Sequence, residues 1–143
     1  MERGVVSAFQ SGIVMGYPCI DIGVTITGAE YSEQSGTEFA FEACASMGFD
    51  EAARIASPIL LEPIMAVDLI APKEYVGEVI SLVTQRGGQV LNMESKTGGD
   101  EVKALAPMAK MFGFMTALRS VSQGRATFSM EFSHFEKPAG RNQ

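Results

Sequence analysis

The order of helical and strand patterns in the second half of the chain is the feature that most limits its fold. Two stretches place apolar residues at helical spacing, and four others carry the alternating or continuous apolar runs of strands. In chain order, the pattern predicts strand 63–71, helix 73–86, strand 88–95, strand 100–106, helix 108–119 and strand 125–135. This βαββαβ order predicts an α+β fold of the ferredoxin-like kind, with two helices on one face of a four-stranded antiparallel sheet.

The connection between the second helix and the last strand holds the main candidate for a binding surface. Helix 108–119 is predicted to bury one apolar stripe, made of Met108, Met111, Phe112, Met115 and Leu118. The last strand is predicted to bury the face that carries Phe128, Met130 and Phe132. Between them lies a polar and basic corner of Arg119, Ser120, Ser122, Gln123 and Arg125. Because packed elements flank this corner on both sides, it is either a rigid binding surface or an ordinary solvated connection.

Three further residues extend the candidate surface around this corner. Lys103 and Lys110 add positive charge, and Phe114 adds an aromatic ring. Cations among hydroxyl groups, with an aromatic ring beside them, suit contacts to phosphates. The net charge of −6 disfavours nucleic-acid binding, but residues 1–60 carry eight acidic and two basic residues and account for all of it. The neutral second half therefore leaves room for local basic patches.

The first half of the chain contains two helical patterns and a single strand pattern. The helices are predicted over 2–12 and from the capping residue Thr37 to about residue 55, and a polar loop, 28–36, precedes the second one. The inner face of the second helix is predicted to consist of Ala40, Ala43, Cys44 and Met47, with Gly48 allowing close packing. Strand 19–27 alternates apolar and polar residues, but no second strand appears before residue 60. We therefore place a boundary near 58–63.

Few catalytic or cofactor-binding patterns are present. The sequence has neither a GxxxxGK[ST] phosphate loop nor a GxGxxG fingerprint, and its Gly-Gly pairs fall at predicted turns. The single histidine, His134, is expected at the rim of the sheet, and no catalytic, metal or cofactor residue is predicted. Cys19 and Cys44 have no partner spacing, which disfavours a disulfide framework or zinc site and fits a reducing, cytoplasmic setting. No apolar run reaches membrane-spanning length.

Six blocks spread over nearly the whole chain carry a family resemblance. They read GYPCIDIGVTIT, EFAFEACASM, ILLEPIMAVDL, EYVGEVI, VKALAPMAKMFGF and LRSVSQGRATFSMEFSHFE. In this order they resemble the C-terminal end of bacterial translation elongation factor G. The resemblance implies that 1–60 is the end of domain IV, a partial unit of the ribosomal-protein-S5-domain-2-like fold. It implies that 61–137 is the ferredoxin-like domain V and that 138–143 is a flexible tail. Met1 would then begin a fragment or a divergent remnant.

The resemblance also implies a function for the parent protein. That parent would be a GTPase that drives tRNA–mRNA translocation on the ribosome with GTP and magnesium, whereas this fragment would bind no cofactor and hydrolyse nothing. Domain V would contact the stalk base and the sarcin–ricin loop of large-subunit rRNA, and the tip of domain IV would reach the decoding centre. Because the family partners of strand 19–27 would be missing, we expect either self-association through its edge or local mobility.

Residues of the family's binding surfaces carry over unevenly. Arg119, Ser120 and Gln123 match the family's segment that approaches the sarcin–ricin loop, and the nearby cations Arg125, Lys110 and Arg86 are added to the predicted rRNA-binding set. The tip loop of domain IV would include Tyr31, Ser32 and Glu33. Ser32 stands where the family has a histidine, and Arg86 is the one cation left of a basic run.

Three alternatives remain open at the level of sequence. The departures from the family pattern favour a specialised paralogue, acting in ribosome recycling or ribosome protection. A stand-alone ferredoxin-like module that binds a small ligand is a second alternative. A small enzyme is the third, and the lack of paired catalytic groups argues most strongly against it.

Overall fold

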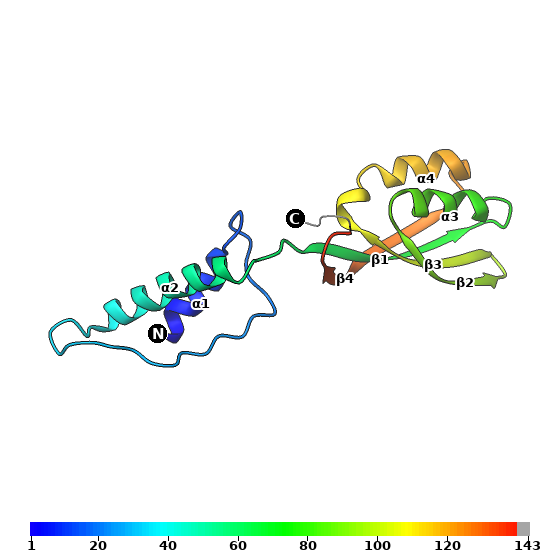
Figure 1. The fold of residues 1–143 in the computed structure, drawn as a ribbon. Coiled ribbons are helices and arrows are strands. Elements are labelled where there is room, and N and C mark those ends of the chain that lie inside the picture. The colour runs from blue at the N-terminus through cyan, green and yellow to red at the C-terminus, as the bar shows by residue number, and fades with distance from the viewer. Residues whose placement is uncertain (140–143) are drawn as a thin grey trace. The chain divides into compact units, whose positions relative to one another are not determined.

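The computed structural model describes residues 1–139, which divide after Leu60 into two compact units. Figure 1 shows the elements of each unit. Residues 140–143, which make up most of the predicted tail, lie outside the described residues. No helix among residues 1–139 is long and apolar enough to cross a membrane.

The second unit is a four-stranded antiparallel sheet with helices on one face. Its elements are β1 (Glu62–Ala71), α3 (Val76–Gln85), β2 (Gln89–Lys96), β3 (Gly99–Pro107), the short 3-10 helix η1 (Met108–Lys110), α4 (Phe114–Ser122) and β4 (Thr127–Glu136). The strands lie in the order β2-β3-β1-β4, and every neighbouring pair is antiparallel. Figure 1 shows α3 and α4 on the same side of this sheet. The predicted α+β fold with its βαββαβ order is therefore confirmed.

The core of this unit lies between the sheet and the two helices. Alternate residues of the central strand β1 point toward the helices, and Val67 and Leu69 are fully buried there. Val79 of α3 and Leu118 of α4 cover them. Because each such side chain contributes about 1.5–3 kcal/mol when it leaves water, this layer is the main source of the unit's stability.

The second predicted helix of this unit begins and ends later than the sequence indicates. Gly113 takes a left-handed conformation (φ 71°), which separates the 3-10 turn of η1 from α4. The predicted stripe is therefore wrong at three positions: Met108 and Met115 are each 42% exposed and Phe112 is 74% exposed. The other two predicted positions, Met111 and Leu118, are buried, and Phe114 is buried with them. The last turn of α4 includes Ser120 and Ser122.

The apolar face of β4 is only partly buried, contrary to the prediction for Phe128, Met130 and Phe132. Phe128 packs edge-on against Phe114, with ring centroids 5.2 Å apart. Met130 and Phe132 remain 38% and 53% exposed. Because β4 is an edge strand of the sheet, it has a neighbouring strand on one side only. An irregularity in its pairing with β1, at Ser133, ends the regular alternation.

The first unit consists of two packed helices and a long extended connection. The helices are α1 (Glu2–Ser11) and α2 (Glu38–Ile55). As predicted, Thr37 caps α2, because its hydroxyl accepts a hydrogen bond from the Ala40 amide at 3.1 Å. An ion pair between Arg3 and Glu38 links the two helices at their surface.

The face of α2 that packs on α1 differs from the predicted one. The small core consists of Val5, Ala8, Ala45 and Phe49. Met47, which was predicted to face inward, is 73% exposed, Cys44 is exposed, and Gly48 adjoins open space. The close helix contact is made by Gly4 instead, where a Cβ would overlap the carbonyl oxygen of Glu42. Because α1 is the one helix that packs on α2 among residues 1–60, α2 buries only Ala45 and Phe49.

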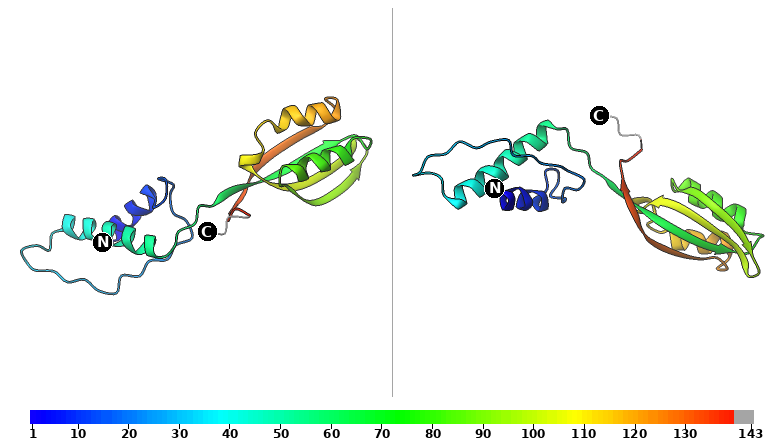
Figure 2. Two further views of the ribbon diagram at one scale, coloured as in Figure 1. Left: turned by 45° about the horizontal axis from the view of Figure 1, so that its top comes forward. Right: turned by 90° about the horizontal axis from the view of Figure 1, so that it is seen from below.

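Residues 19–27 do not form the predicted strand. Figure 2 draws this stretch as a trace without an arrow. Ile20, Ile22, Val24 and Ile26 are between 42% and 47% exposed. Residues 1–60 contain no strand, so this stretch has no neighbour in its own unit with which to form a ladder.

Candidate nucleic-acid interface

The predicted RNA-binding residues of the second unit fall into two groups at the two ends of α4. Arg119, Ser120, Gln123 and Arg125 lie at its C-terminal end, and Lys110 precedes its N-terminal end, where the side chain of Arg86 joins it. The nine residues of α4 span about 13 Å at 1.5 Å per residue, and Arg119 and Ser120 lie past the middle of the helix, on the side away from Lys110. The structure therefore yields two small basic sites rather than one continuous patch.

The C-terminal corner is held in place by a buried serine. Ser122 is fully buried; its hydroxyl donates to the carbonyl oxygen of Leu118 at 2.6 Å and accepts from the amide of Ala126 at 3.1 Å. These two bonds join the last turn of α4 to the start of β4. Ser122 is thus a structural residue, and its predicted place in the exposed polar corner is wrong because no part of it reaches solvent.

Three residues around this anchor present polar groups to solvent. Arg119 and Ser120 are exposed on the last turn of α4, and among the described residues Arg119 makes no ion pair. Gln123 ends the helix in a left-handed conformation (φ 51°), and the amide of Gly124 then donates to the carbonyl of Arg119 at 2.9 Å. The corner has a defined backbone geometry and an available guanidinium group.

Arg125 already has a partner. Its Nη1 lies 2.8 Å from Oε1 of Glu74, in the connection between β1 and α3, and both side chains are about 60% exposed. A solvent-exposed pair of this kind contributes about 0–1 kcal/mol. A phosphate can therefore compete for Arg125, although the neighbouring carboxylate weakens its attraction for anions.

The second basic site combines Arg86 and Lys110. Arg86, at the C-terminal end of α3, donates from Nη1 to the carbonyl oxygens of Lys110 at 3.0 Å and Phe112 at 2.7 Å. The Lys110 side chain runs over Gly87, about 3.3 Å from where a Cβ would stand. Within residues 1–139 neither cation forms an ion pair. One nitrogen of the Arg86 guanidinium group is thus used in hydrogen bonds to the backbone, whereas Lys110 is exposed to solvent.

The aromatic residue predicted beside the basic corner is the wrong one. Phe114 is 1% exposed and belongs to the core, so its ring cannot reach a ligand. Phe112 is the exposed ring in this region. The sequence signal for it is Gly113, which ends one helical turn and starts another, and so turns Phe112 away from the stripe that Phe114 and Leu118 bury.

The predicted tip residues of the first unit lie in an ordered turn ahead of α2. Ser32 closes it: its hydroxyl is 2.6 Å from that of Ser35, and its carbonyl accepts from the Gly36 amide at 2.8 Å. The ring of Tyr31 packs edge-on against Phe41 with centroids 5.3 Å apart, and Glu33 is exposed. The turn therefore exposes polar groups on a defined backbone.

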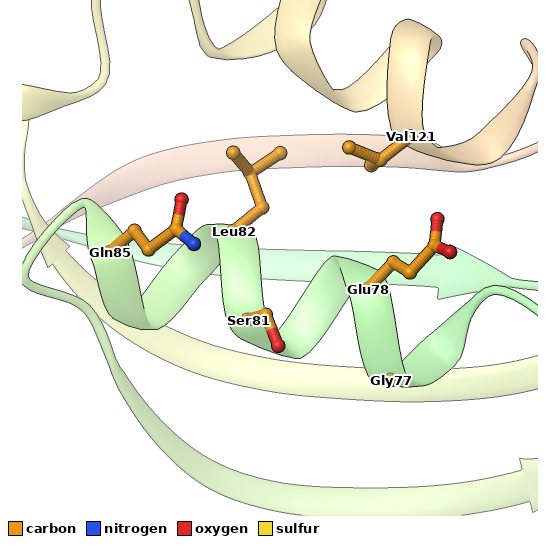
Figure 3. A pocket seen from close by; sticks show the side chains of 6 residues that line it. All are labelled: Gly77, Glu78, Ser81, Leu82, Gln85 and Val121. Atoms are coloured by element: carbon orange, nitrogen blue, oxygen red, sulfur yellow. The ribbon is translucent and has the colours of Figure 1, made fainter.

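The groove between α3 and α4 and the single histidine both lie apart from the predicted RNA-binding residues. A shallow groove between α3 and α4 is lined by Gly77, Glu78, Ser81, Leu82, Gln85 and Val121, as Figure 3 shows. His134 is half-buried on β4, where Nδ1 lies 2.9 Å from the Ser133 hydroxyl and Nε2 lies 3.1 Å from Glu136. Both ring nitrogens of this histidine therefore contact side chains of its own strand.

Comparison with known protein families accounts for both units. Residues 1–57 match the family model described as elongation factor G, domain IV, and residues 59–143 match the one described as elongation factor G C-terminus. The chain belongs to the elongation factor G family. In family terms, the turn at Tyr31–Glu33 lies in the domain IV match, and both basic sites lie in the C-terminal match.

Relatives of known sequence and structure agree with this assignment. Elongation factor G 1 of Treponema denticola is 54% identical over 136 residues, which cover 95% of this chain. Elongation factor G 2 of Treponema pallidum is 49% identical over 139 residues, or 97% of the chain. The chain spans about 20% of the length of each of these two elongation factors. A crystal structure of a protein from Thermus thermophilus superposes with a TM-score of 0.88 at 31% identity, covering 97% of this chain and 21% of that one.

Proposed function

We propose that this chain is the ribosome-binding module of an elongation factor G-like GTPase and takes part in tRNA–mRNA translocation. The observation that carries the proposal is the pair of basic sites at the two ends of α4. Arg119 at one end and Lys110 at the other are exposed cations without ion pairs among residues 1–139, on a backbone that buried residues fix. Cations held in this way suit phosphates of folded RNA, because they lose little conformational freedom on binding.

The two units would bind different parts of the ribosome. The basic sites of the second unit would contact large-subunit rRNA at the sarcin–ricin loop and the stalk base. In that contact, Arg119 and Arg125 would pair with phosphates, while Ser120 and Gln123 would donate neutral hydrogen bonds that fix position. The turn with Tyr31, Ser32 and Glu33 would reach toward the decoding centre. None of these three residues carries a positive charge, so they suit neutral hydrogen bonds that fix position more than contacts to phosphates.

GTP and magnesium would be bound by other parts of the full-length protein, which acts in the cytoplasm. We assign the nucleotide to those other parts because the sequence of this chain has no phosphate loop and its two Gly-Gly pairs close turns. Gly87 takes φ 73° after α3, and a Cβ at Gly88 would meet Val83. No hydrolytic step is therefore assigned to residues of this chain.

The proposal is tested by pelleting the chain with purified 50S subunits over a series of salt concentrations. We expect binding at low salt. Replacing Arg119 with alanine should weaken it and lower the slope of log affinity against log salt by about 0.7–0.9 for one lost phosphate contact. Lys103, which the sequence placed in the candidate surface, lies instead on the sheet face away from the helices, because its neighbours Val102 and Ala104 are buried beneath them. Lys103→Ala is therefore the matched control and should bind like the unchanged protein. Absence of binding at low salt, or binding unaffected by Arg119→Ala and Arg125→Ala together, would contradict the proposal.

Two neighbouring serines separate binding from folding in the same assay. Ser120→Ala removes an exposed hydroxyl and should weaken 50S binding without changing the unfolding midpoint. Ser122→Ala leaves the buried Ala126 amide without its acceptor. It should therefore lower the free energy of unfolding by about 1–3 kcal/mol. If Ser120→Ala also lowered the unfolding midpoint, its weaker binding would reflect a loss of folding, and the proposed rRNA contact of Ser120 would be wrong.

A second copy of the chain is the proposed partner of segment 19–27. The support is four exposed β-branched residues in alternation, Ile20, Ile22, Val24 and Ile26, of which the last three follow the bend at Asp21 (φ 56°). Two such segments would pair edge to edge. Sedimentation velocity should then show dimers whose fraction rises with concentration, and Ile22→Lys should abolish them. A protein that remains monomeric at high concentration rules out this pairing.

A further inference from the structure

The loop between η1 and α4 exposes a large aromatic side chain. Phe112 is 74% exposed, and two methionines near it in the chain, Met108 and Met115, are each 42% exposed. Single exposed apolar residues are common on proteins, but three large ones within eight consecutive residues are more typical of a contact surface. Phe112 is therefore a candidate contact residue rather than a misplaced core residue.

The loop is fixed from three directions, so the exposure of the ring is built into its conformation. Arg86 donates to the carbonyl oxygens of Lys110 and Phe112, at 3.0 and 2.7 Å. Met111 is 7% exposed and anchors the loop in the core. Gly113, at φ 71°, turns the chain into α4. A ring held in this way loses little entropy when a ligand packs on it.

The charges around the ring favour a nucleic acid as the ligand. Lys110 is exposed two residues before Phe112, and in the described part of the chain neither Lys110 nor Arg86 has a carboxylate partner. An aromatic face beside cations is the arrangement that takes an unpaired nucleotide, since the base stacks on the ring while the phosphate meets the positive charge.

We propose that Phe112 is a stacking platform for an unpaired base of ribosomal RNA, with Lys110 contacting the adjacent phosphate and Arg86 positioning the loop. The inference rests on the proposed ribosome binding and adds to it a residue and a mode of contact. It also gives Arg86 a different role from a direct phosphate contact. The Arg86 guanidinium acts through the Lys110 and Phe112 carbonyls, so its loss would displace both binding side chains at once.

The stacking contact is tested with 50S subunits and three variants of Phe112. Phe112→Ala should weaken binding about tenfold, in the range measured for loss of one aromatic–base stack, without changing the salt slope. Phe112→Leu keeps the apolar volume but has no aromatic face, and should be as weak as alanine. Phe112→Trp introduces the only tryptophan of the chain, and its emission should fall when 50S subunits are added. The same subunits should give no such change with a tryptophan placed at Phe39, on the first unit.

The outcomes separate this inference from the proposed function. If the unchanged protein fails to bind 50S subunits, both are wrong. If it binds and Phe112→Ala binds equally well, the stacking contact alone is wrong. Full binding by Phe112→Leu would show an apolar protein pocket as the partner, and that too overturns base stacking.

The role of Arg86 has its own readout. Arg86→Lys keeps the charge but loses the planar group that reaches two carbonyls. Positioning predicts that this variant binds more weakly than Phe112→Ala, because both binding side chains are displaced, and that its salt slope falls by about 0.7, as in Lys110→Ala. It also predicts that adding Arg86→Lys to Phe112→Trp lowers the fluorescence anisotropy of the introduced tryptophan in the free protein. Normal binding and normal anisotropy with Arg86→Lys would overturn the positioning role, whereas Lys110→Ala should lower the salt slope by about 0.7.

Discussion

Gly4 lies where the two helices of the first unit approach each other most closely. A Cβ at this position would overlap the carbonyl oxygen of Glu42 and approach the side chain of Ala45. Gly4→Ala should therefore destabilise the first unit by about 1–3 kcal/mol, even though alanine favours a helix more than glycine does. Urea unfolding followed by far-ultraviolet circular dichroism measures the change.

The matched control for Gly4 is Gly48 on the partner helix. Gly48 adjoins open space, so a methyl group there meets nothing. Gly48→Ala should stabilise α2 by about 0.5–1 kcal/mol through helix propensity alone. Equal effects of the two substitutions would mean that α1 and α2 do not pack as described.

At the scale of elements, the hairpin of β2 and β3 carries a pH-dependent link. Lys96 donates a hydrogen bond to Glu101, which lowers the pKa of Glu101 from its usual 4.5, and the same bond raises the pKa of Lys96 from 10.5. The carboxylate thus stabilises the folded state above its unfolded pKa, and this contribution is lost as pH falls through the lowered pKa. The ammonium group contributes below its unfolded pKa and loses its effect as pH rises through the raised one.

The prediction for this link is a stability difference confined to a pH window. Urea unfolding of the unchanged protein and of Glu101→Gln should differ between about pH 5 and pH 10, on the ordinary values of the two groups. The difference should shrink steadily as pH falls below that window, because Glu101 becomes protonated in both states. Glu131→Gln, on β4 and without an ion pair among the described residues, is the control. A difference that persists unchanged in strong acid would assign the effect to something other than charge.

The second unit was more predictable from sequence than the first for physical reasons visible in its elements. Each strand and helix there packs on another element of the same unit, so apolar periodicity and burial agree, as in β1 and α3. The periodicity failed around Gly113, because one left-handed residue rotates the helix that follows and changes which side chains are buried. That rotation placed Ser122 and Phe114 inside and Phe112 outside, and so altered the candidate site while leaving Arg119, Ser120 and Gln123 on the surface.

In the first unit, some segments have the apolar periodicity of a strand or helix but no neighbouring element on which to bury their apolar side chains. The alternation over 19–27 is that of a half-buried strand, yet an alternating pattern cannot form a strand without a neighbour. The same holds for α2, where Met47 is 73% exposed although it was predicted to face inward. Sequence patterns report what a segment can bury, and only the rest of the unit decides what it does bury.

At the scale of the whole molecule, the two units differ greatly in the size of their cores. Four buried residues form the core of the first unit, Val5, Ala8, Ala45 and Phe49, whereas the core of the second joins fifteen across β1, β3, α3, α4 and their connections. Local opening is easiest where few apolar contacts oppose it. Hydrogen exchange should therefore show slow amides in β1 and β3, faster ones in α1 and α2, and the fastest in residues 20–31.

The expected differences in exchange rate follow from the backbone hydrogen bonds of each segment. The amide of Cys19 donates to Phe9 at 2.9 Å, but beyond it the described residues show no backbone bond for 20–31 until the turn that Ser32 closes. Exchange should be measured at several protein concentrations beside sedimentation. Protection of Ile22 and Val24 that grows with concentration would indicate pairing between two copies. Slow exchange of these amides in a protein shown to be monomeric would contradict the absence of a strand, since only a hydrogen-bonded neighbour protects an exposed extended backbone.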